Sequence, residues 1–188
     1  MRNLFRISNK DEINQITEIL IAAFGDLREN DKQLIGNHGD NESYCNKQKL
    51  HEVCINHRLA IYIEKHLKCK NLNYNVDIEY NKKNYSSKEI EINGNCKEVR
   101  PDIIVHIRAN NKGIQDNYLI IEAKKDKNST YDKNKINSFM RDPSFLYKFG
   151  CKIIYGDLGE SCNIKLYYSE NGQKIDYVEI KLDKCHNT

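Results

Sequence analysis

Two short apolar runs, joined by a polar stretch and ending in charged residues, most constrain how this chain can fold. They lie within Arg100–Lys125, which reads RPDIIVHIRANNKGIQDNYLIIEAKK. Each run alternates with the two-residue period of a β-strand, so successive side chains point to opposite faces of a sheet. The pattern therefore predicts a β-hairpin over residues 100–125, with its turn in the polar stretch 109–117 around Gly113.

The alternation also predicts which side chains share a face of this hairpin. The second run predicts one face with four residues, Tyr118, Ile120, Glu122 and Lys124. The first run predicts one face with Asp102, Ile104 and His106. Pairing the two strands would bring Asp102, Glu122 and Lys124 onto one surface. Two carboxylates beside a lysine are sufficient to hold a divalent metal ion and to activate a water molecule.

The composition predicts a soluble globular protein. The chain has 188 residues, 39% of them hydrophobic and 30% charged, which suits a single folded domain. Its net charge of +3 permits a nucleic-acid partner without requiring one. Seven cysteines with no CxxC pair, no signal-like N-terminus and no apolar stretch of membrane-spanning length predict a cytoplasmic protein with reduced thiols and no membrane partner.

The N-terminal region predicts an amphipathic helix. Ser8 is placed to cap this helix, apolar residues recur at helical spacing as far as Phe24, and Gly25 predicts its end. Residues 26–43 are polar and rich in turn-forming residues, which predicts a connector. We therefore expect residues 1–43 to form an N-terminal helical extension, packed on a main domain of residues 44–188.

A second helix is predicted from about Tyr44 to Lys68. The expected buried side contains Leu50, Val53, Cys54 and Ile61, and a wider stripe adds Ile55, Leu59, Tyr62 and Ile63. Glu52 lies one turn before Ile55, which places it at the margin of the apolar face and not on the fully exposed side.

Further along the chain, the patterns predict a mixed α/β architecture. Strands are expected at residues 76–80 and 151–155, a loop or short edge hairpin at 81–98, and a final hairpin across Asn171-Gly172. A third helix is expected at 132–141, followed by a short helical turn that Gly150 closes. The predicted fold class is therefore α/β, with a mixed central β-sheet flanked by helices.

The acid and lysine residues of the hairpin define a candidate catalytic site. Mg²⁺ prefers oxygen ligands and keeps several waters, so Asp102, Glu122 and the backbone carbonyl of Ala123 would suffice to bind it. Lys124 could then orient or deprotonate the attacking water, or stabilise a phosphate in the transition state. The alternative interpretation is a salt-bridged surface cluster without chemistry, which is common at strand ends.

The ordered residues Pro101-Asp102 and Glu122-Ala123-Lys124 resemble the motif of the PD-(D/E)xK nuclease superfamily. The segment HEVCINHRLAIYIEKHL resembles the helix on which many members carry a further acid, here Glu52. The resemblance covers about residues 44–155. It implies a restriction-endonuclease-like sheet and a nuclease, endo- or exonucleolytic, that uses Mg²⁺ or Mn²⁺. Asp102 and Glu122 would be ligands, Lys124 catalytic, and Glu52 would assist the metal or the water.

A nuclease also implies partners and further contacts. The expected substrate is nucleic acid, with DNA preferred, and Lys133 and Lys135 at the start of the third helix are candidates to bind its phosphates. Cleavage of a duplex would suit a homodimer. The alternative function is a non-catalytic nucleic-acid or protein-binding module with a nuclease-like fold, such as a subunit of a restriction or phage-defence system.

Overall fold

The computed structural model describes residues 3–31, 34, 52–80, 82–83, 86–87, 89–92, 94–108, 116–124, 130–155 and 162–182. Its long helices are α1 (Lys10–Asn30), α3 (Glu52–Cys69) and α4 (Thr130–Arg141). Six strands form the main sheet: β1 (Asn75–Ile78), β6 (Ile103–Ile107), β7 (Asp116–Lys124), β8 (Phe149–Ile154), β9 (Cys162–Tyr168) and β10 (Asp176–Leu182). Two small hairpins pair β2 (Lys82–Lys83) with β3 (Ser86–Ser87), and β4 (Glu89–Ile92) with β5 (Asn95–Glu98).

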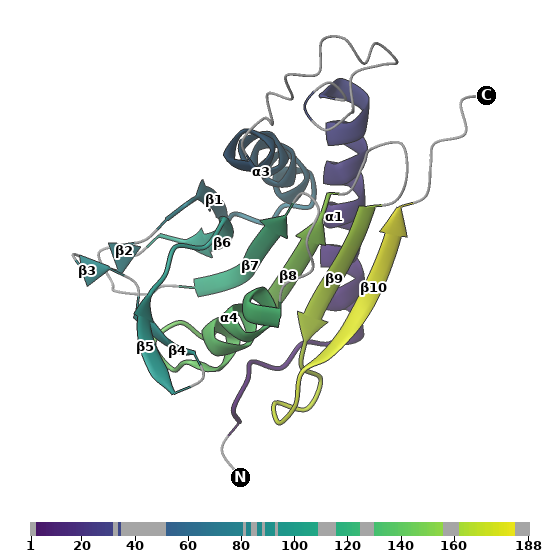
Figure 1. Cartoon of the computed structure of the whole chain (residues 1–188). Coiled ribbons are helices and arrows are strands. Elements are labelled where there is room, and N and C mark those ends of the chain that lie inside the picture. The colour runs from purple at the N-terminus through teal and green to yellow at the C-terminus, as the bar shows by residue number, and fades with distance from the viewer. Residues whose placement is uncertain are drawn as a thin grey trace.

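The main sheet is mixed, with strand order β1-β6-β7-β8-β9-β10. Only β7 and β8 run parallel, and the other neighbouring pairs are antiparallel. A parallel pair needs a crossover connection, and α4 lies in this one. The predicted α/β class, with a mixed sheet flanked by helices, is thereby confirmed (Figure 1).

Each face of the sheet carries its own hydrophobic core. One core lies between the sheet and helices α1 and α3, and contains Ile103, Leu119 and Ile121 from the central hairpin. The other lies under α4 and the β4–β5 hairpin, and contains Ile104 and Ile120. The central strands are buried on both faces because the alternating residues of β6 and β7 serve different cores.

Helix α1 belongs to the first of these cores. Its N-cap is Asn9, whose side chain accepts a hydrogen bond from the Glu12 N–H, while the Glu12 carboxylate accepts one from the Asn9 N–H. The predicted cap at Ser8 is therefore wrong by one residue. The predicted end at Gly25 is also wrong, since Gly25 lies on the exposed side and the helix continues to Asn30. The predicted domain boundary at residue 43 lies outside the described residues.

The buried side of α3 is only part of the predicted one. Ile55, Leu59, Tyr62 and Ile63 are buried as predicted, but Val53, Cys54 and Ile61 are exposed. The prediction counted apolar residues around more of the helix than one face can bury. Leu50 and the predicted start at Tyr44 lie outside the described residues. None of the described helices is long and apolar enough to cross a membrane, and the five described cysteines are all free thiols.

An irregularity in the β6–β7 pairing changes the predicted face of Tyr118. Val105 pairs with Leu119 but His106 pairs with Asn117, so Tyr118 is an extra residue in β7. A bulge of this kind interrupts the two-residue alternation. Tyr118 consequently packs in the α1–α3 core against Phe149 and does not share a face with Ile120.

Gly150 was predicted to close a helical turn, but it lies within β8 under α4. A Cβ atom at this position would lie 2.2 Å from Cγ2 of Ile136 and 2.9 Å from Sδ of Met140. Glycine therefore lets α4 approach the sheet closely, and this approach fixes the position of the polar residues on the same helix.

Candidate functional site

Side chains from three separate elements meet at the end of β7. The ammonium of Lys124 lies 3.3 Å from Oε2 of Glu52, in the first turn of α3, and 3.8 Å from Oδ2 of Asp102, just before β6. These three residues are spread over more than seventy positions of the chain. The structure therefore brings together Glu52, Asp102 and Lys124, as the sequence predicted, with Lys124 between the two acids.

The carboxylate of Asp102 also binds the backbone of β7. Its Oδ2 accepts a hydrogen bond of 2.8 Å from the Ala123 N–H. The Lys124 carbonyl, one residue on, accepts from Tyr155 beyond β8. In a strand, the N–H and C=O of one residue point to the same side, and those of the next residue point to the other side. Because the Lys124 carbonyl points toward β8, the Ala123 carbonyl points the other way, beside Asp102, as the Ala123 N–H does. A carboxylate and a backbone carbonyl thus lie side by side at this edge.

Glu122 points from β7 toward α4 and is 2% exposed. The Lys135 ammonium of α4 lies 2.8 Å from its Oε1 and 2.9 Å from its Oε2. The same ammonium donates to the carbonyl of Arg100 at 2.8 Å. Lys135 therefore ties α4 both to the predicted ligand Glu122 and to the segment that precedes Asp102.

The environment shifts the pKa values of all three central groups. Burial raises the pKa of Glu122 to about 8, although Lys135 opposes the shift. Burial also raises the pKa of Asp102, against the Ala123 N–H and Lys124. For Lys124, burial alone would lower the pKa, but Asp102 and Glu52 outweigh it and the pKa rises. Lys124 is consequently an ammonium at neutral pH and is suited to hold negative charge, not to accept a proton.

The two lysines predicted to bind substrate phosphates have different surroundings. Lys133 is exposed on α4 and lines a pocket between this helix and the β9–β10 hairpin. Lys135 is only 7% exposed and its ammonium is bound to Glu122 and the Arg100 carbonyl. Lys135 falls on the stripe that α4 buries, so its ammonium is not exposed to a substrate phosphate as the predicted role requires.

Two further buried charged residues adjoin Glu122 and were missed by sequence reasoning. Asp132, in the first turn of α4, lies 3.8 Å from the ammonium of Lys152, which is the β8 neighbour of Glu122. A signal for the α4 residues was present in the sequence. Asp132, Lys135, Ile136 and Phe139 follow the i, i+3, i+4, i+7 spacing of one helix face.

The donor atoms fit a hard divalent cation. Asp102 and Glu122 supply carboxylates, and the Ala123 carbonyl lies beside Asp102. Both oxygens of Glu122 are already in contact with the Lys135 ammonium, which a cation at Glu122 would have to share. Oxygen donors of this kind suit Mg²⁺ or Mn²⁺. Within the described part of the chain, no three His, Cys, Asp or Glu side chains form a ready metal-binding group. A site here would consist of two carboxylates, one carbonyl and water.

Comparison of the chain with protein-family models, with curated proteins and with solved structures found no match.

Proposed function

We propose that this protein is a metal-dependent nuclease that hydrolyses phosphodiester bonds, with DNA as the expected substrate. The observation that carries the proposal is the convergence of Glu52, Asp102 and Lys124 at the end of β7. These residues come from three elements, and a surface salt bridge would require only two of them. The predicted restriction-endonuclease-like fold, cytoplasmic location and homodimer stay predictions.

Asp102, Glu122 and the Ala123 carbonyl would hold Mg²⁺ or Mn²⁺. When bound, the cation would act as a Lewis acid and lower the pKa of a coordinated water. Lys124 would bind a nonbridging oxygen of the scissile phosphate and stabilise the charge that develops there. Glu52 would hold the Lys124 ammonium in position through its 3.3 Å contact. Lys135 opposes the effect of burial on Glu122 and would orient this carboxyl group through their 2.8 Å contact.

The test is a cleavage assay on plasmid, linear and single-stranded DNA with Mg²⁺, with Mn²⁺ and with EDTA. Removing a group that stabilises the transition state typically lowers the rate by about 100- to 1,000-fold, and we expect this loss for Lys124→Ala. The matched control is Lys65→Ala, which removes an exposed lysine of α3 that pairs with Asp26. Equal rates for wild type and Lys124→Ala would refute the catalytic proposal.

One observation favours a second candidate, a non-catalytic binding module. Lys135 already supplies a positive charge to Glu122 inside the fold, so this acid is partly neutralised by the protein itself. Isothermal titration with Mn²⁺ separates the two functions. Binding that is lost in Asp102→Asn supports the nuclease. If Mn²⁺ binding does not depend on Asp102 and the protein still binds nucleic acid at low salt, the non-catalytic module is supported.

A further inference from the structure

We propose that the pocket between α4 and the β9–β10 hairpin binds an unpaired strand of nucleic acid. Lining residues that the argument uses are Lys133, Arg141, Lys174, Tyr167 and Tyr177. We call this pocket the α4–hairpin groove. The inference rests on the proposed nuclease function, because it assigns the groove to the strand that leads to the cleavage site.

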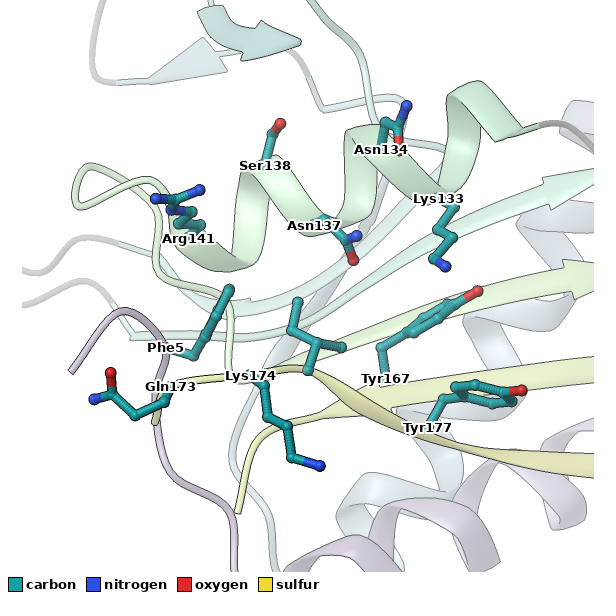
Figure 2. A pocket seen from close by; sticks show the side chains of 11 residues that line it. Phe5, Lys133, Asn134, Asn137, Ser138, Arg141, Tyr167, Gln173, Lys174 and Tyr177 are labelled. Atoms are coloured by element: carbon teal, nitrogen blue, oxygen red, sulfur yellow. The ribbon is translucent and has the colours of Figure 1, made fainter. Parts of the chain in front are cut away.

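The charged groups of the groove suit a polyanion. Lys133 and Arg141 lie on α4, and Lys174 lines the groove from the turn before β10, with its side chain extending away from α4 (Figure 2). None of the described residues that line it is acidic. Lys174 contacts Asp176 at 3.0 Å, but its side chain is 67% exposed. Exposed pairs of this kind contribute little and can exchange for a phosphate.

The hairpin side of the groove carries aromatic rings. Tyr177 is 54% exposed. The centroid of its ring lies 6.0 Å from the ring centroid of Tyr167. The Lys165 ammonium lies 5.1 Å from the Tyr177 ring centroid. Figure 2 shows Lys133 extending from α4 toward Tyr167. Aromatic faces combined with cations are the usual means of binding single strands, because every base can stack.

The dimensions select an unpaired strand over a duplex. The groove has a volume of about 530 Å³, within the range of about 300 to 1,000 Å³ in which small-molecule sites fall. This volume suits one or two nucleotides with a base turned toward the exposed ring of Tyr177, which Tyr167, itself only 3% exposed, supports from behind. A duplex keeps its bases stacked on one another, so it could present only its phosphates to this surface.

The sheet connects the groove to the candidate catalytic site. Glu122, Lys152 and Lys165 are lateral neighbours on β7, β8 and β9. With strands about 4.8 Å apart, Lys165 lies roughly 10 Å from Glu122 across this row. Tyr167 shares the face of Lys165, two residues further along β9. A strand lying in the groove would therefore reach Lys165, with the buried Lys152 between it and Glu122.

Fluorescence anisotropy of the full chain in EDTA tests the proposal without cleavage. The probes are a labelled oligo-dT of about 12 nucleotides, a labelled duplex and thymidine monophosphate as competitor. We expect Tyr177→Leu to weaken oligo-dT binding by about 5- to 150-fold, and Tyr177→Phe to bind like wild type. Lys174→Gln should reduce the salt slope by about 0.7. Both positions are exposed, so these variants should fold normally.

The control is Lys68→Gln. Lys68 is also 67% exposed and also contacts an acid close in sequence, Glu64 at 3.2 Å, but it lies on α3 at the opposite face of the sheet. It should leave oligo-dT binding unchanged.

Unchanged binding by Tyr177→Leu, or equal binding of duplex and oligo-dT, would overturn the groove assignment even if the protein cuts DNA. Displacement by thymidine monophosphate as effective as by unlabelled oligo-dT would also overturn it. Tyr177-dependent binding without any cleavage in Mg²⁺ would leave the groove standing and refute the nuclease.

Discussion

Glu122 is a buried acid whose charge depends on the cation beside it. Lys135 is the cation that the fold provides, and it binds Glu122 with both partners almost fully inaccessible to water. Removing one member of such a pair leaves an uncompensated charge in a poorly solvated place. The pair therefore links the stability of the fold to the same carboxylate that the proposed chemistry needs.

This link predicts a double-mutant result. Above pH of about 8, where Glu122 is ionised, Lys135→Met should lower the free energy of unfolding by about 3–5 kcal/mol, because the Glu122 carboxylate loses its partner. Adding Glu122→Gln should restore most of that loss, since the remaining amide carries no charge. Urea denaturation of the four proteins in the cycle measures both effects. Lys133→Met, at an exposed position two residues earlier, is the control and should change stability by less than about 0.5 kcal/mol.

A different outcome would return Lys135 to its sequence-predicted role. If its function were only to bind substrate phosphates, Lys135→Met would unfold at the wild-type urea midpoint. The double variant would then have no loss to recover, and only nucleic-acid binding would change.

The raised pKa of Glu122 predicts a pH dependence of stability. Burial keeps Glu122 protonated in the folded state up to pH of about 8, whereas its ordinary pKa is 4.5. Between these values the folded state binds more protons than the unfolded state, so stability falls as the pH rises. The contribution of Glu122 is complete below pH 4.5 and is lost by about pH 8. Denaturation in EDTA at several pH values should show this slope in wild type and a flatter one in Glu122→Gln. Equal slopes of stability against pH in wild type and Glu122→Gln would contradict this role of Glu122.

At the level of elements, α4 positions the charged residues through its contact with Gly150. The helix carries Lys135 toward Glu122 only while Ile136 and Met140 rest on a bare glycine of β8. The contact between α4 and β8 thus sets both the position of Lys135 beside Glu122 and the apolar packing of the helix on the sheet.

Gly150→Ala should therefore both destabilise the protein and impair the site. The added Cβ would overlap Ile136, and overpacking of this kind costs about 1–3 kcal/mol. Moving α4 outward would also lengthen the Lys135–Glu122 contact and slow any cleavage. Adding Ile136→Ala should remove the overlap and restore part of the cleavage rate. Thermal unfolding and the plasmid assay measure the two consequences.

The control is another glycine in a regular element. Gly25 lies on the exposed side of α1, and a Cβ there would meet nothing within 4 Å. Gly25→Ala should stabilise the protein by roughly 0.5–1 kcal/mol, because alanine loses less freedom in a helix. A Gly150→Ala variant as stable as this control would show that α4 does not depend on close contact with β8.

The elements also show which features a sequence can predict. Alternation predicted the β6–β7 hairpin, and ordered acids predicted that Asp102 and Lys124 would meet. Tyr118 was misplaced because a bulge is set by the pairing of two strands and not by either sequence alone. Lys135 was misplaced because lysine in a helix is usually solvated. Its burial becomes evident only when Glu122 faces it across a tertiary contact.

For the whole molecule, the strand order β1-β6-β7-β8-β9-β10 combines local and distant pairing. The hairpins β6–β7 and β9–β10 join neighbours in sequence, and their patterns predicted them. The pairing of β1 with β6 and the parallel pairing of β7 with β8 join segments separated by other elements. Such contacts depend on how the helices cover the sheet, which periodicity does not specify.

Helix α1 provides a test at this scale, because the sequence assigned it to an extension while it packs in the main core. Its seven buried residues form one cluster with α3 and the sheet, and Phe24 lies 5.8 Å, ring to ring, from Tyr155. Tyr155 in turn donates to Asn56 of α3 at 2.6 Å. Removing α1 would expose the apolar face of α3 and one face of the sheet to water. Exposed apolar area of this size cannot be offset elsewhere in a chain whose net stability is about 5–15 kcal/mol.

We therefore expect a protein of residues 44–188 to lack a cooperative unfolding transition and to lose near-ultraviolet circular dichroism from its tyrosines. The full chain should unfold in one transition, with α1 and the sheet losing structure together. Phe24→Ala in the full chain offers a milder form of the test and should cost about 3–5 kcal/mol. A cooperative transition in residues 44–188 at the full-length midpoint would show instead that α1 is a separable extension, as its sequence alone suggested.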